Sequence, residues 1–122
     1  PEKFRRHFQS LRDGLTQGMR GATQPVGRPS YADFGAGVAA ALAHVRANWE
    51  GNVLLVSSGG PISTAVGQVL ATAPEITIEL NLRMRNSCVT EFHFNTKRCS
   101  LITFNTLPHL DAAQYLEWVT HA

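Results

Sequence analysis

The residues best suited to chemistry in this chain are four consecutive small ones: Ser57, Ser58, Gly59 and Gly60. They follow the apolar run Val53 to Val56 and precede a segment whose apolar residues have helical spacing. A glycine turn between a strand and a helix presents free backbone N–H groups and the positive end of the helix dipole, and both favour an anion. We therefore predict that these four residues bind a phosphate group.

A purely structural interpretation of this turn stays open, because many strand-to-helix turns use adjacent glycines only to bend sharply. The turn is not a Walker loop, since no Gly-Lys-Ser/Thr follows. The spacings Gly-x-Ser-x-Gly and Gly-x-Gly-x-x-Gly are also absent, which excludes a nucleophile elbow and a dinucleotide fingerprint. The chemistry at this turn is thus predicted to be anion binding without a catalytic group.

Other candidate residues are weaker. Asn105 and Thr106 end a predicted strand and are expected to border the pocket. His44 is predicted to be partly exposed and His93 solvated, and His109 is expected to bond the backbone. No pair of histidines or cysteines has the spacing of metal ligands, so neither a metal nor a cofactor is predicted.

The elements before the turn include two predicted helices. Apolar residues at helical spacing predict an amphipathic helix over residues 3 to 17, followed by a Gly- and Pro-rich loop to Pro29. Ser30 and Asp33 form a Ser-x-x-Asp arrangement, which predicts a helix start, and an apolar stripe continues the helix to about Trp49. The run Val53 to Val56 then predicts a strand covered on both faces, as in parallel sheets.

After the turn, Pro61 suits the first position of a helix. The segment from Glu75 to Met84 suits a strand or a short helix equally well. Alternating apolar residues, with Ile102 and Phe104 on one face, predict a hairpin of residues 87–94 and 100–104. Asp111 is expected to cap a last helix. Three strands make a thin sheet for so apolar a strand as Val53 to Val56, so sheet partners are predicted to be missing.

Composition limits the class of protein. The chain has 122 residues, of which 43% are hydrophobic and 16% charged, which fits one globular domain. The net charge of +2 is too small to indicate a nucleic-acid arm. No segment has the apolar length of a membrane helix and the start lacks a signal peptide, so a cytoplasmic protein without membrane or nucleic-acid partners is predicted.

Three motifs carry a resemblance to a known family. "VLLVSSGGPI" resembles the second active-site motif of the histidine phosphatase superfamily, which has the phosphoglycerate mutase-like fold. "SYADFGAGVAAALAHV" resembles the helix before that motif, and "RNSCVTEFHFNTKRCSLITFNTLPHL" resembles the closing hairpin of the family and its Asn-x-x-x-His-Leu ending. The motifs occur in the family's order over residues 30 to 110.

The resemblance implies a three-layer α/β/α sheet and phosphoryl transfer through a phosphohistidine, with a phosphorylated small molecule or phosphate as ligand. Ser58 stands where the family has its second catalytic histidine. The nucleophile motif Arg-His-Gly is absent, since the only Arg-His pair, Arg6-His7, precedes Phe8. The expectation is that residues 1–122 form the C-terminal part of one domain, an incomplete α/β sheet without its N-terminal strands, and that this chain is inactive as phosphatase (hydrolase) or mutase (isomerase).

Two alternatives to an enzyme fragment remain open at this point. One is a non-catalytic module that binds phosphate or another anion at Ser57 to Gly60. The other is an interaction protein whose open sheet edge pairs with a second copy or with a missing N-terminal segment.

Overall fold

A computed structural model describes residues 12–13 and 30–121 of the chain. Along the chain come the helices α2 (Tyr31–Asn48), α3 (Gly59–Leu70) and α4 (Pro74–Leu82), the strands β1 (Val89–Phe94) and β2 (Cys99–Thr106), and the short 3-10 helices η1 (Pro108–Leu110) and η2 (Ala113–Trp118). The predicted helix over residues 3–17 and the loop after it lie outside the described residues, except that Arg12 and Asp13 are helical. The described fold mixes helices with one small sheet.

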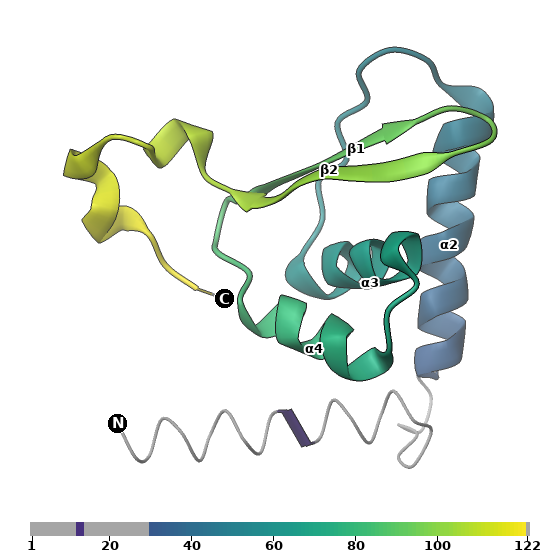
Figure 1. Cartoon of the computed structure of the whole chain (residues 1–122), viewed down its shortest axis with the longest axis horizontal. Coiled ribbons are helices and arrows are strands. Elements are labelled where there is room, and N and C mark those ends of the chain that lie inside the picture. The colour runs from purple at the N-terminus through teal and green to yellow at the C-terminus, as the bar shows by residue number, and fades with distance from the viewer. Residues whose placement is uncertain (1–11, 14–29, 122) are drawn as a thin grey trace.

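Helix α3 is the central element of this fold. It packs against α2, α4 and β2, and Figure 1 shows the hairpin and α4 on opposite sides of it. Val66 on α3 is fully buried, and the other buried hydrophobic residues are Ala65, Ile78 and Met84. The hydrophobic core of the described residues is therefore small and lies where α3 meets α4.

Helix α2 begins as its sequence predicts. The Ser30 hydroxyl accepts a hydrogen bond from the Asp33 N–H at 3.1 Å, and the Asp33 carboxylate accepts one from the Ser30 N–H at 3.3 Å. This reciprocal pair is a capping box, which satisfies two N–H groups that have no partner within the helix. The predicted apolar stripe is only half covered, since Phe34 is 37% exposed and no described residue of α2 is fully buried.

The prediction of a strand over Val53 to Val56 is wrong for this structure. The segment forms no strand and is highly exposed: Leu54 is 87% and Val56 90% accessible to solvent. A strand needs a neighbour with which to exchange backbone hydrogen bonds, and in the described part of the chain the only sheet consists of β1 and β2, neither of which pairs with this segment. In Figure 1 it is part of the connection between α2 and α3.

The observed helices answer two other questions: which helical position Pro61 occupies, and whether the segment after Glu75 is a strand or a helix. Helix α3 begins at Gly59, so Pro61 is its third residue and not its first. The ambiguous segment after Glu75 is helical, because Pro74 supplies a favourable first position for α4 and the segment packs its buried Thr77 and Ile78 against α3.

The hairpin is confirmed. Strands β1 and β2 pair antiparallel, and the Asn95 side chain closes the turn by accepting hydrogen bonds from the N–H groups of Lys97 and Arg98 at 2.8 and 2.7 Å. The register shifts twice near Glu91, which places Leu101 opposite Phe92. Ile102 is consequently 46% exposed, so the prediction that it shares a covered face with Phe104 is wrong.

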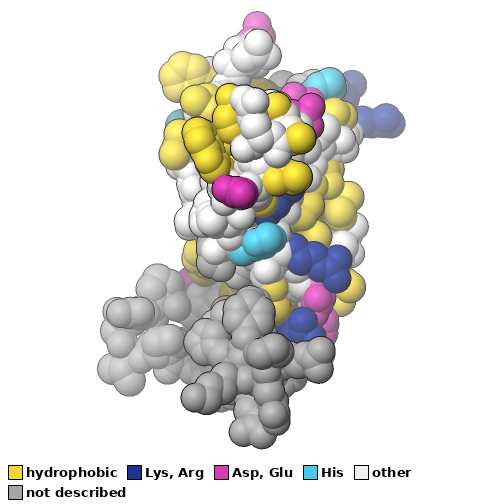
Figure 2. All heavy atoms as spheres, turned by 90° about the vertical axis from the view of Figure 1, so that its left-hand side faces the viewer, with side chains coloured by type: hydrophobic (Ala, Val, Ile, Leu, Met, Phe, Trp, Pro, Cys, Tyr) yellow, Lys and Arg dark blue, Asp and Glu magenta, His cyan; other side chains and the backbone are white. Residues whose placement is uncertain are grey.

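The last helix is also different from the prediction. Asp111 caps no α-helix, because the chain forms the two short 3-10 helices η1 and η2, and the residue before η2 is Ala112. Leu116 is 71% and Trp118 64% exposed, so this segment has little core to pack against. Figure 2 shows the face on this side of the molecule, where hydrophobic side chains lie open among polar ones.

No helix in the described ranges 12–13 and 30–121 is long and apolar enough to cross a membrane.

Candidate functional site

The predicted anion-binding turn lies at the N-terminus of α3. Ser58 is the N-cap residue, with extended backbone, and its side chain makes no capping hydrogen bond. Gly59 and Gly60 are the first two helical residues, whose N–H groups have no partner within a helix. No acidic residue lies in the first turn of α3, and Ser57 and Ser58 are exposed. The turn therefore offers N–H and hydroxyl donors and the positive end of the helix dipole to an anion.

Packing of the helices also explains part of the glycine content of this turn. A Cβ atom on Gly59 would lie 2.8 Å from Asn81 Oδ1 and 3.5 Å from Met84 Cβ, because the start of α3 is pressed against the end of α4. Gly60 has more room, since the nearest side-chain atom to such a Cβ is Phe34 Cζ at 4.0 Å. A close approach of two helices thus explains Gly59, whereas no contact of this kind explains Gly60.

Asn105 joins the end of β2 to the segment that follows α4. Its Nδ2 donates to the Arg83 carbonyl at 2.8 Å, and its Oδ1 accepts from the Arg85 N–H at 2.8 Å. The Arg85 guanidinium in turn donates to the Asn105 carbonyl. Met84, between these two arginines, is one of the residues that lie within 4 Å of a Cβ placed on Gly59. Asn105 therefore acts on the turn indirectly, by holding the segment beneath it.

Thr106 has a local role in the hairpin. Its hydroxyl donates to the Val89 carbonyl at 3.1 Å, across the first residue pair of the ladder. The position of Asn105 and Thr106 on the border of a ligand pocket stays a prediction.

None of the hydrogen bonds described for the histidines reaches the turn from Ser57 to Gly60. His44 is exposed, as predicted, and so is His93, whose Nε2 lies 3.8 Å from Glu91 Oε1. His109 does not bond the backbone as expected: its Nε2 lies 2.9 Å from the Ser87 hydroxyl, which makes a side-chain pair between η1 and the loop before β1. Among residues 12–13 and 30–121, no three His, Cys, Asp or Glu side chains gather as metal ligands.

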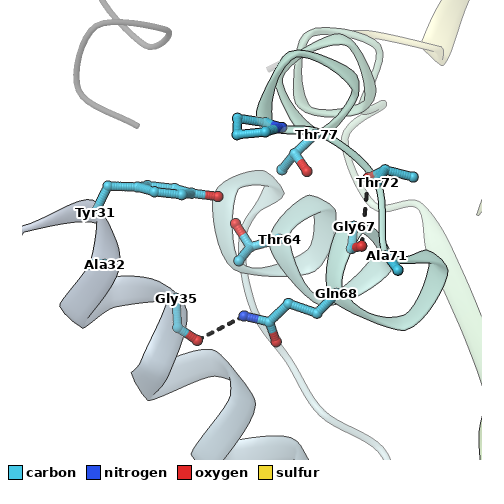
Figure 3. Close-up of a pocket in the computed structure, with 10 residues that line it drawn as sticks. Tyr31, Ala32, Gly35, Thr64, Gly67, Gln68, Ala71, Thr72 and Thr77 are labelled. Atoms are coloured by element: carbon cyan, nitrogen blue, oxygen red, sulfur yellow. Dashed lines mark hydrogen bonds between the residues drawn. The ribbon is translucent and has the colours of Figure 1, made fainter. Parts of the chain in front are cut away.

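A pocket of about 260 Å³ lies at the other end of α3, where α2 begins and α4 begins. Figure 3 shows it between the three helices. The sequence did not predict this pocket. Its wall on α3 consists of residues whose spacing puts them on one face of the helix: Thr64, Gly67, Gln68 and Ala71. That face was not recognisable as a pocket wall, because its opposite walls come from other helices, α2 and α4, whose packing against α3 the spacing within α3 does not reveal. None of the predicted site residues lines this pocket.

Comparison with known proteins supplies the class. The family model of the histidine phosphatase superfamily (branch 1) matches residues 2–107, most of the chain. The chain belongs to this superfamily. No curated protein and no solved structure gives a significant match. The resemblance seen in the sequence is thus confirmed at the level of the superfamily.

Proposed function

We propose that this chain is the C-terminal part of a histidine phosphatase domain, in which Ser57 to Gly60 form one side of a phosphate site. The parent activity is transfer or hydrolysis of a phosphoryl group through a phosphohistidine, and the chain by itself is inactive. The observation that carries this proposal is the exposed segment Val53 to Val56, which leads directly into a turn of unpaired donors.

The exposed segment supports a domain with further strands. All four residues are apolar, yet they are 36% (Val53), 87% (Leu54), 57% (Leu55) and 90% (Val56) exposed. Neighbouring strands would hydrogen-bond to both edges of Val53 to Val56, and helices on both faces of that sheet would cover its side chains, which gives a three-layer α/β/α arrangement.

The chemistry of the turn supports binding without catalysis. A serine hydroxyl donates a hydrogen bond to a phosphate oxygen but carries no positive charge, unlike the protonated imidazole that the family has in the place of Ser58. Binding of the ground state can persist while stabilisation of the transition state is lost. Arg6-His7, the one Arg-His pair in the sequence, lies outside the described residues and is not followed by glycine.

Inorganic phosphate is expected to bind the turn saturably, and Gly60→Asp is expected to abolish this binding. The variant places a carboxylate at the helix start, where it competes with the anion, while a Cβ at Gly60 has room. The measurement is a phosphate titration followed by the NMR shifts of the Gly59 and Gly60 amides, with the Gly59 amide alone followed in the variant. Gly37→Asp is the matched control, because it adds the same charge in α2 with no neighbouring atom within 4 Å.

Two outcomes count against the proposal. Phosphate shifts that do not saturate, or that persist in Gly60→Asp, exclude the turn as the phosphate site. Hydrolysis of a generic phosphomonoester by the unchanged chain, lost in Ser58→Ala, contradicts the proposal that the chain is inactive by itself.

A second candidate function is pairing of Val53 to Val56 with the same segment of a second copy. Uncharged, β-branched and leucine residues in an exposed segment favour such strand pairing between copies. Leu54→Lys together with Val56→Lys is expected to prevent self-association while changing the free energy of unfolding of the monomer by less than about 0.5 kcal/mol, since both side chains are exposed. Sedimentation equilibrium measures the association. A strictly monomeric unchanged chain at high concentration rules out this candidate and leaves the phosphate proposal intact.

A further inference from the structure

The pocket at the C-terminal half of α3 lies away from the phosphate turn, which is at the other end of the helix. Three helices line it: the start of α2, one face of α3 and the start of α4. The described lining residues are Tyr31, Ala32, Gly35, Thr64, Gly67, Gln68, Ala71, Thr72, Pro74 and Thr77. Its volume is about 260 Å³, many times what a single water molecule requires.

Two threonines that line this pocket make no side-chain hydrogen bond among the described residues. As residues they are 4% (Thr64) and 7% (Thr77) exposed, but their hydroxyl oxygens are not fully buried and open into the pocket. In Figure 3 the Tyr31 hydroxyl points from α2 toward Thr64, and Thr77 extends from α4 toward α3. These three hydroxyl groups are polar groups of the pocket wall that can exchange hydrogen bonds with a bound molecule.

Two other side chains of the pocket form hydrogen bonds with the backbone of its walls and not with Thr64 or Thr77. Gln68 Nε2 donates to the Gly35 carbonyl at 2.7 Å, which joins α3 to α2. The Thr72 hydroxyl donates to the Gly67 carbonyl at 3.5 Å, within the end of α3. The walls of the pocket are therefore held by bonds of their own, and the hydroxyls of Thr64 and Thr77 remain available.

The lining selects the chemistry of the ligand. No described lining residue is charged, so an ion would lose its hydration without a compensating partner. An apolar molecule would leave both threonine hydroxyls unsatisfied. A molecule with several hydroxyl groups and no charge meets both conditions.

We propose that this pocket binds a neutral polyhydroxylated molecule of about monosaccharide size. The hydroxyls of Thr64 and Thr77 exchange hydrogen bonds with the ligand, and Tyr31 closes one side. This site is separate from the phosphate turn and does not depend on the proposed function.

The test is an NMR titration of the chain with glucose and, separately, with myo-inositol. Melting temperature is not the readout for binding, because polyols raise it in most proteins by exclusion from the surface. We expect saturable shifts of the amides of Thr64, Gly67 and Thr77 with at least one of the two probes. Thr64→Val and Thr77→Val keep the shape of the side chain and each weaken binding about five- to tenfold, the effect of one lost hydrogen bond.

Thr103→Val on β2 is the matched control, since Thr103 is exposed and lies outside the pocket, and its affinity for the probe should equal that of the unchanged chain. Amide shifts of Thr77→Val away from the pocket should match those of the unchanged chain, which shows that the variant folds. The proposal is overturned if neither probe gives saturable shifts at the pocket, or if both valine variants bind as tightly as the unchanged chain. Phosphate shifts at Gly59 are independent of either result.

Discussion

Replacing Asn105 with alanine is expected to lower the free energy of unfolding by about 2–4 kcal/mol. The variant loses two side-chain hydrogen bonds, to the Arg83 carbonyl and from the Arg85 N–H. It also places alanine at a backbone φ of 58°, in the left-handed region that asparagine tolerates better. Urea unfolding measures the change.

Asn105→Gly separates the two causes. Glycine adopts the left-handed backbone without strain but makes neither side-chain bond, so about 1–2 kcal/mol of the loss should return. The amide shifts of Gly59 should change in both variants, because Met84, held between Arg83 and Arg85, lies 3.5 Å from a Cβ placed on Gly59. A loss below about 0.5 kcal/mol in Asn105→Ala would show that these bonds do not stabilise the fold.

Gly67→Ala is expected to destabilise the protein by about 1–3 kcal/mol, although alanine is normally the better helix former. The new Cβ would collide with Thr77 Oγ1 and would lie 3.3 Å from Thr72 Oγ1, so the Thr77 side chain must rotate or α3 and α4 must move apart. Thermal or urea unfolding measures the loss.

Gly37→Ala provides the matched control in α2. Nothing lies within 4 Å of a Cβ at that position, so the same substitution should stabilise the protein by about 0.5–1 kcal/mol. Gly67→Ala combined with Thr77→Ala should recover part of the loss, because the colliding hydroxyl is removed. Equal effects at the two glycines would contradict the close approach of α3 to α4 at Gly67.

Features that depend on neighbouring residues could be predicted from the sequence. The capping box of Ser30 and Asp33 is formed by side chains three residues apart, so its pattern is sufficient to recognise it. The hairpin is recognisable because its strands alternate and its turn is short. The predicted face of Ile102 was wrong because two register shifts are set by pairing with β1, which the alternation in β2 cannot reveal.

The candidate site was predictable to the same extent. The sequence places Ser57 to Gly60 before a helix, and the structure has them at the start of α3. The link from Asn105 through Met84 to Gly59 could not be predicted, because it joins segments more than twenty residues apart. The hydrogen bond between Ser87 and His109 could not be predicted for the same reason, since these two residues are also far apart in the sequence.

The sequence by itself determined the superfamily, the start of α2, the hairpin and the position of the glycine turn, because each depends on residue order or on short-range bonding. Only the tertiary structure decided that Val53 to Val56 lies exposed and that Thr64 and Thr77 face a common pocket. An apolar pattern indicates that a segment can be buried, but burial itself requires a second surface that packs against it. The pocket likewise requires that helices from three parts of the chain meet.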